Sequence, residues 1–302
     1  MNPAKRPPKG GKGGRGGPPP RGRGAPPARG RGAPPRTRQQ AAREPGRPSA
    51  PKGLGGEQVE GRQAVRELLL GGRRRVRDVW LVDDVDDAPI IGDILELATE
   101  QRVTVRRVTR NQLDAEAHSE APQGVLAHAA TLPEAELDSL CRRGRDGRPP
   151  FLLALDSITD PQNVGALLRT AECAGVSGVL LPRHRAAHVT PTVAKAAAGA
   201  IEHLDIALVS GLPAALARVK ELGVWVVGLD GAGDQSLFDL PVATEPVVLV
   251  LGAEGSGIGR LTQERCDVVA AIPLAGALGS LNVAAAGALA CFEVARRRLA
   301  VG

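Results

Sequence analysis

Three short segments combine glycines with polar side chains that suit ligand binding and hydroxyl chemistry. The polar side chains that we single out are Asn163 and Arg169 in residues 156–169, Glu254 in residues 252–257, and Ser280 and Asn282 in residues 272–286. Amide, hydroxyl and guanidinium groups can orient a hydroxyl or a phosphate by hydrogen bonding. Because none of the three motifs contains His or Cys, the usual general bases are missing from them.

The second segment is a glycine-rich turn that follows the apolar run Val247–Leu251. Such a turn lets backbone amides approach a ligand closely. Its spacing, Gly252-x-x-Gly255-x-Gly257, is neither a Walker loop nor the Gly-x-Gly-x-x-Gly order of dinucleotide sites, which argues against a nucleotide-dependent oxidoreductase. Because Glu254 would repel a pyrophosphate, the turn favours a neutral or cationic ligand.

Simpler roles for these side chains remain open on the residues alone. Asp160 before Pro161 predicts a helix start, and Asn163 could help to cap it. At 100° per residue, Arg169 lies roughly 150° from the apolar stripe of that helix, which also suits a solvated side chain. Ser280 could be the N-cap of the Ala-rich helix that follows it.

These segments must be positioned by the second half of the chain, where short apolar runs alternate with helical patterns. We predict strands at 151–155, 179–181, 204–209, 224–229, 247–251 and 268–272, and helices at 161–174, 192–198, 212–222, 258–266 and 283–299. This alternation predicts an α/β domain over residues 151–302, with a mostly parallel sheet covered on both faces. Ligands bind beyond the carboxyl ends of such strands, where all three segments fall.

The rest of the chain divides into three parts. Residues 53–130 predict a small α/β domain, and the polar residues 131–150 predict a linker. Residues 1–52 hold 14 Lys or Arg, one acidic residue and 13 prolines, which predicts a disordered basic tail. Its Arg-Gly repeats suit association with RNA, although a solubilising tail without a specific partner is the alternative.

Composition excludes several classes of protein. The apolar runs are shorter than the roughly 20 residues that cross a bilayer, and no apolar stretch follows the N-terminal charges as in a secretory signal. The four cysteines are too far apart for a metal knuckle and too few for a disulfide scaffold. We therefore expect a cytoplasmic protein with no membrane partner and no bound metal.

Taken together, the three segments resemble the motifs of the SpoU (TrmH-type) branch of the SPOUT RNA methyltransferases. The matching residues are Asn163-x-Gly-x-x-x-Arg169, Gly252-Ala-Glu-Gly-x-Gly257, and Ile272-Pro-Leu-x-Gly followed by Ser280-Leu-Asn-Val283. Lys195–His203 is also similar to a family segment, with Ala197 where Ser is common. The resemblance implies transfer of a methyl group from S-adenosylmethionine to a ribose 2′-hydroxyl.

The resemblance also implies which residues form the catalytic and cofactor-binding sites, a knotted backbone and a dimeric state. The catalytic set would be Asn163, Arg169, Glu254, Ser280 and Asn282, and the cofactor would bind at Gly252, Ile272 and Leu281, with Leu229 a further candidate. Family members carry a trefoil knot in this domain and act as homodimers. We expect Arg169 to clamp an RNA phosphate rather than to act as a base, because guanidinium resists deprotonation.

Upstream, Gly61–Leu69, Val79–Val82 and Gln123–Val125 resemble the small RNA-binding domain of bacterial 23S rRNA guanosine 2′-O-methyltransferases. The RNA partner is therefore expected to be 23S rRNA. The alternatives are tRNA, another rRNA ribose, or RNA binding without catalysis. Because aromatic residues are only 2% of the chain, RNA contacts are expected mainly from basic side chains. The candidates are Arg73, Arg74, Arg75, Arg77, Arg102, Arg106, Arg107, Arg110, Arg183 and Arg185.

Overall fold

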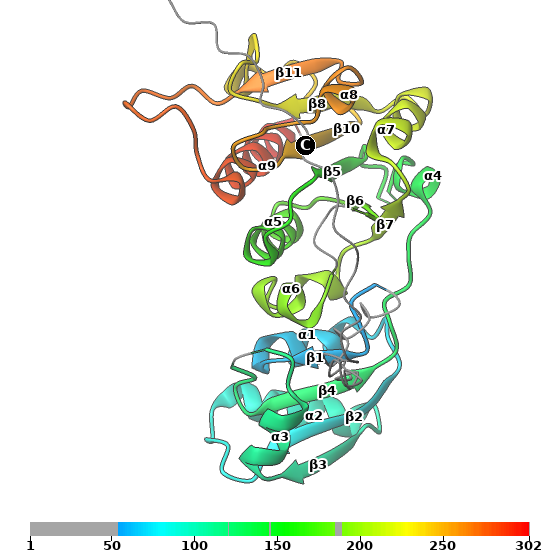
Figure 1. Cartoon of the computed structure of the whole chain (residues 1–302). Coiled ribbons are helices and arrows are strands. Elements are labelled where there is room, and N and C mark those ends of the chain that lie inside the picture. Colours follow the sequence, from blue (N-terminus) through cyan, green and yellow to red (C-terminus); the bar gives the residue numbers. More distant parts are fainter. Residues whose placement is uncertain (1–53, 120, 145, 185–188, 302) are drawn as a thin grey trace, which may run out of the picture. The chain divides into compact units, whose positions relative to one another are not determined.

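The computed structural model describes residues 54–119, 121–144, 146–184 and 189–301. The predicted disordered tail at 1–52 and the candidate RNA contact Arg185 lie outside these residues. The described chain contains two β-sheets, each with its own helices, and we call these the first and second units; a short connection joins them (Figure 1).

The first unit is built on a four-stranded mixed sheet. Its elements are β1 (Gln58–Glu60), α1 (Arg62–Gly71), β2 (Val76–Val82), α2 (Pro89–Glu100), β3 (Thr104–Val108), α3 (Arg110–Glu116) and β4 (Val125–Ala129). The strand order is β1-β4-β2-β3, with only β2 and β3 parallel. The apolar faces of α1 and α2 form one core with the sheet, and Leu113 of α3 packs on the opposite face with Val82 and Leu126. Strand β1 and helix α3 were not predicted.

The connection contains more structure than a polar linker requires. Within residues 131–150, α4 (Leu137–Leu140) forms a single helical turn. Leu140 and Cys141 are buried against the second unit, and burial raises the pKa of the Cys141 thiol to about 11. This part of the chain is therefore anchored to the second unit by apolar contacts.

The second unit holds a seven-stranded sheet. Its strands are β5 (Phe151–Asp156), β6 (Gly178–Pro182), β7 (Ile206–Val209), β8 (Trp225–Leu229), β9 (Gln235–Ser236), β10 (Val247–Gly252) and β11 (Val268–Ala271). Every pairing in the order β7-β6-β5-β10-β8-β11-β9 is parallel, as predicted. The helices are α5 (Pro161–Cys173), α6 (Pro191–Ala196), α7 (Leu212–Glu221), α8 (Arg260–Gln263), α9 (Val283–Leu299) and the 3₁₀ turns η1 (Ala200–Glu202) and η2 (Leu237–Asp239).

The sheet is buried on both faces, which explains its continuous apolar strands. In β5, Leu153 and Leu155 face the core that includes residues of α5, α6 and α9, whereas Leu152 and Ala154 face the core formed with α7. Figure 1 shows the helices distributed over the two faces in this way. The predicted helix at 258–266 is shorter than expected, because α8 spans only Arg260–Gln263.

Glycines bring the helices near the site into close contact. A Cβ added to Gly287 of α9 would lie 2.2 Å from a methyl of Leu167 on α5 and 2.7 Å from one of Leu251 on β10. A Cβ added to Gly165 of α5 would lie 2.3 Å from that of Ala196 on α6. The N-terminal part of α9 therefore packs directly on the strand and helix that carry the other two motifs.

A buried ion pair ties the two units together. Arg74 donates to Oε1 of Glu202 at 2.9 Å and to the backbone oxygens of Ala130 and Gly56, and both charged side chains are buried. Nearby, Arg73 pairs with Asp205. The prediction that Arg74 contacts RNA is therefore wrong, because this guanidinium is enclosed between the two units.

No helix among residues 54–119, 121–144, 146–184 and 189–301 has the length and apolar character needed to cross a membrane. The trefoil knot stays a prediction.

Candidate active site

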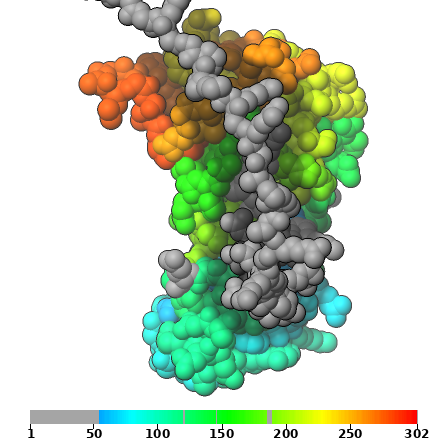
Figure 2. All heavy atoms as spheres, viewed as in Figure 1, coloured from blue at the N-terminus to red at the C-terminus, as the bar shows by residue number. Residues whose placement is uncertain are grey.

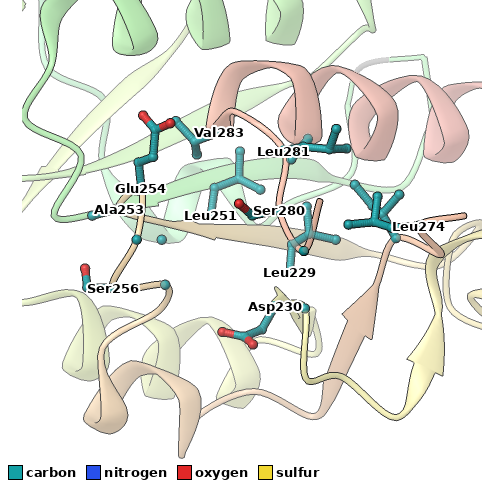
Figure 3. A pocket seen from close by; sticks show the side chains of 17 residues that line it. Leu229, Asp230, Leu251, Ala253, Glu254, Ser256, Leu274, Ser280, Leu281 and Val283 are labelled. Atoms are coloured by element: carbon teal, nitrogen blue, oxygen red, sulfur yellow. The ribbon is translucent and has the colours of Figure 1, made fainter. Parts of the chain in front are cut away.

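The second and third motif segments line one pocket beyond the carboxyl ends of the central strands (Figure 3), whereas the first, residues 156–169, lies outside its lining. The sheet places β10 between β5 and β8, with Gly252 beside Asp156 and Leu251 beside Leu229. The pocket has a volume of about 370 Å³, within the usual range of small-molecule sites. Its lining residues are Leu229, Asp230, Gly231, Leu251–Gly257, Ile272, Leu274, Gly279, Ser280, Leu281, Val283 and Ala286.

The glycine-rich turn closes tightly on itself at the end of β10. The Gly257 amide donates to the Ala253 carbonyl at 2.9 Å, and Gly255 and Gly257 have φ of +82° and +65°. A Cβ on Gly252 would lie 2.1 Å from the carbonyl carbon of Gly257, so this position requires glycine. The turn thereby presents backbone to the pocket where side chains would block it.

A buried carboxylate at the end of β5 anchors the far side of this turn. Oδ2 of Asp156 accepts a hydrogen bond from the Gly259 amide at 2.9 Å, and Oδ1 accepts one from the Ser157 hydroxyl at 3.1 Å. Asp156 is 7% exposed, and Ser157 has φ of +60°. The first and second motifs are thus linked through Asp156.

A second link joins the first and third motifs. Nδ2 of Asn282 donates to Oδ1 of Asn163 at 3.0 Å. Oδ1 of Asn282 accepts from the amides of Ala284 and Ala285, so Asn282 is the N-cap of α9 and the alternative that Ser280 caps this helix is wrong. The amides of Gln162 and Asn163 donate to the side chain of Asp160, which caps α5 as predicted.

The structure distributes the predicted catalytic residues around the pocket. Glu254 and Ser280 line it, whereas Asn163, Arg169 and Asn282 do not. Arg169 is exposed and forms no hydrogen bond or ion pair with the rest of the described chain. It lies six residues after Asn163 on α5, about 9 Å along the helix axis. Its guanidinium is therefore available to a ligand outside the pocket.

All four predicted cofactor-binding residues, Leu229, Gly252, Ile272 and Leu281, line the pocket. Sequence reasoning missed one charged member of the lining, Asp230, which directly follows β8. The charged side chains of the lining are those of Asp230 and Glu254, both acidic (Figure 3). A mixed apolar and backbone-lined pocket with only acidic charges fits a cationic nucleoside such as S-adenosylmethionine.

Comparison with protein families assigns both units. Residues 150–292 match the model of the SpoU rRNA methylase family, and residues 58–135 match that of the RNA 2′-O ribose methyltransferase substrate-binding domain. The second match covers the unit built on the mixed sheet, and the first covers the unit that carries the pocket.

Individual relatives agree with this assignment. The chain is 40% identical over 245 residues to a Pseudomonas aeruginosa protein named 23S rRNA (guanosine-2′-O-)-methyltransferase RlmB, covering 80% of this chain and 97% of that one. It is 38% identical over 245 residues to a Bacillus subtilis protein, YacO, whose provisional name is TrmH family tRNA/rRNA methyltransferase, covering 81% and 97%. A solved structure of an rRNA methyltransferase from Sinorhizobium meliloti with bound AdoMet aligns with a TM-score of 0.64 at 25% identity, over 80% of this chain and 87% of that chain.

The fold, the pocket and these matches define the class: an S-adenosylmethionine-dependent methyltransferase that acts on ribose 2′-hydroxyls of RNA. Within that class, the chain belongs to the SpoU rRNA methylase family.

Proposed function

We propose that this enzyme methylates the ribose 2′-hydroxyl of a guanosine in 23S rRNA. The observation that carries the proposal is a pocket lined by the second and third motif segments, to which Asp156 and Asn163 of the first are joined by hydrogen bonds. The same chain also matches an RNA-substrate-binding domain. The choice of 23S rRNA and of guanosine rests on the names of the relatives. Their bacterial origin and ribosomal substrate support the cytoplasm as the place of action.

S-adenosylmethionine would supply an electrophilic methyl group on a positively charged sulfur. In the proposal, Leu229, Gly252, Ile272 and Leu281 hold the donor, with backbone groups of the glycine-rich turn facing it. Binding in a pocket shaped by the tight turn fixes the position of the methyl group and so lowers the entropic barrier to transfer.

The hydrogen bond between Asn163 and Asn282 determines which side-chain atom is left to bind a substrate. Because Oδ1 of Asn282 accepts helix amides, its Nδ2 must donate to Asn163, and Oδ1 of Asn163 is the acceptor. The remaining polar atom of the Asn163 side chain is therefore a donor. We assign Asn163 to donating a hydrogen bond to the ribose oxygen, while the Ser280 hydroxyl, which can also accept, orients the proton of that hydroxyl.

Arg169 is assigned to binding the phosphate beside the target ribose. Its exposed guanidinium offers two parallel N–H groups that match a phosphate. Glu254 is exposed on the turn itself. We assign it to maintaining the geometry of the turn and of the neighbouring site, not to proton transfer.

We also propose that the enzyme works as a homodimer. Residues 273–282 between β11 and α9 are all exposed, Leu278 to 82%, and Figure 2 shows this orange segment projecting from the body. On α9, Leu289 and Phe292 are also exposed and lie one helical turn apart. Light scattering should report twice the chain mass of 31.3 kDa, and Phe292→Asp combined with Leu278→Asp should give monomer. A wild-type mass of one chain would refute the dimer.

Transfer of labelled methyl groups tests the substrate. The full chain is incubated with methyl-labelled S-adenosylmethionine and either unmethylated 23S rRNA, 16S rRNA or tRNA. We expect incorporation into 23S rRNA alone, at one guanosine located by 2′-O-methyl mapping. Incorporation only into tRNA, which the provisional name of the Bacillus relative would allow, would overturn the choice of substrate.

A further inference from the structure

Asp230 occupies a constrained place in the wall of the pocket. Its backbone amide donates to the Ala270 carbonyl at 3.0 Å, and its carbonyl accepts from the Gly233 amide at 3.1 Å. Oδ1 of its side chain accepts from the Ala232 amide at 2.9 Å. Both the backbone and one carboxylate oxygen are therefore fixed where β8 and β11 end.

The second carboxylate oxygen faces the glycine-rich turn. A Cβ built on Gly257 would lie 2.8 Å from Oδ2 of Asp230. Within the described part of the chain, Oδ2 accepts no hydrogen bond and Asp230 joins no ion pair. Figure 3 shows Asp230 and Glu254 extending from different segments of the lining. A partly buried carboxylate without a counter-ion attracts a cationic ligand more strongly than an exposed one does.

The proposed reaction changes the charge of the molecule in this pocket. The ribose oxygen forms a bond to the methyl carbon as the carbon–sulfur bond breaks, the sulfur keeps the bonding pair, and the hydroxyl proton passes to solvent water. The donor is a sulfonium, whereas the product, S-adenosylhomocysteine, lacks the methyl group and its sulfur is a neutral thioether. Both molecules keep the amino-acid ammonium and carboxylate, so a fixed negative charge beside the sulfur attracts the donor more strongly than the product.

From this we infer that Asp230 is a specificity-determining residue that makes the pocket prefer the sulfonium donor over the spent thioether. The inference rests on the proposed function and extends it to product release. Each turnover removes the charge that Asp230 attracts, so the product leaves a pocket to which it is less suited. Glu254 contributes less to this preference for the sulfonium, because its side chain is exposed to solvent, which screens its charge.

The substitution Asp230→Asn tests the effect of the negative charge separately from the hydrogen bond that shapes the turn. The Asn side chain keeps an oxygen for the Ala232 amide and nearly the same volume, but it carries no charge. Asp234→Asn is the matched control, since Asp234 is exposed, lies four residues away and does not line the pocket. Asp230→Glu tests rescue, because it restores the charge.

Isothermal titration of the full chain measures the dissociation constants of three probes. They are S-adenosylmethionine, S-adenosylhomocysteine, and sinefungin, which carries an ammonium in place of the methylsulfonium. In Asp230→Asn, we expect the Kd of both cationic probes to rise about tenfold and that of S-adenosylhomocysteine to change less than about twofold. Asp234→Asn should leave all three constants unchanged, and Asp230→Glu should recover the preference at least in part.

The outcomes separate this inference from the proposed function. Equal weakening of all three probes would mean that Asp230 contacts a group that they share, which overturns the inference. Unchanged constants in Asp230→Asn would overturn it as well. If the wild-type chain bound none of the probes, the proposed function itself would fail. If the wild-type chain bound the cationic probes while Asp230→Asn showed no selective loss, the proposed function would stand without the inference.

Discussion

The side chains of Asn163 and Asn282 are joined by a hydrogen bond of 3.0 Å across 119 residues of sequence. Asn163 lies in the first turn of α5, and Asn282 caps α9. The two helix starts are therefore held together beside the pocket, and each amide orients the other. This relationship leads to a first prediction about the hydroxyl-binding group.

Asn163→Ala should lower kcat by about 100-fold, the usual size of a lost transition-state hydrogen bond. The Kd of S-adenosylmethionine should stay within about twofold, because Asn163 does not line the pocket. The Asn282 cap should persist in the variant, so thermal unfolding should change little. Single-turnover methyl transfer and calorimetry measure these effects. A variant with wild-type turnover would show that Asn163 does not contact the substrate.

Arg169→Lys should lower kcat/KM for RNA by about 10- to 100-fold, because lysine keeps the charge but loses the paired N–H groups. Donor affinity should not change, since Arg169 lies outside the pocket lining. Arg218→Lys is the control: Arg218 is an exposed arginine of α7 that pairs with Asp138. Near-normal turnover of Arg169→Lys would rule out the phosphate clamp.

Gly252→Ala should abolish donor binding, with Kd raised at least about 100-fold. The added methyl would overlap the backbone of Gly257 and force the turn open. Gly211→Ala provides the comparison, because a Cβ there meets nothing within 4 Å. Titration with S-adenosylmethionine distinguishes the two variants, and equal affinities would contradict the described turn.

Substitution of the two residues of the buried ion pair should lower stability to different extents. Arg74→Met leaves Glu202 buried without its partner and should lower the free energy of unfolding by about 3–5 kcal/mol. Burial raises the pKa of Glu202 despite the nearby Arg74, so a neutral side chain is tolerated better there. Glu202→Gln should therefore lower the free energy of unfolding clearly less than Arg74→Met does. Urea unfolding of both variants compares them, and equal losses would refute the asymmetry.

The stability contributed by Glu293 on α9 should depend on pH. Hydrogen bonds from Arg296 and Arg297 lower the pKa of Glu293 from 4.5 to about 2. A lowered folded-state pKa stabilises the protein above the unfolded value, and this contribution is lost as pH falls from about 4.5 to about 2. Glu293→Gln should thus be less stable than wild type at pH 6, with the difference shrinking toward pH 2. A difference independent of pH would contradict the ion pair.

The sequence predicted the architecture well because strands buried on both faces are recognisable as apolar runs. The family resemblance also singled out Gly252, Ile272 and Leu281, and the end of the neighbouring strand suggested Leu229; these residues line one pocket. The sequence offered Ser280 as the cap of α9, whereas the cap is Asn282, because the first helical turn begins at Val283.

Two other features depended on contacts that no local pattern encodes. Arg74 stands in a run of arginines typical of a solvated surface, and its burial arises from Glu202, 128 residues away. Asp230 looks like an ordinary loop residue, since its importance comes from the neighbouring turn after β10. Such long-range relationships appear only once the sheet order is known.

The most direct test of the central claim is 2′-O-methyl mapping of 23S rRNA from cells that lack this gene, complemented with the wild-type chain or with Gly252→Ala. The account predicts one guanosine that is unmethylated in the deletion, methylated with the wild-type chain, and unmethylated with the variant. Full methylation of every 23S rRNA site in the deletion strain would contradict it.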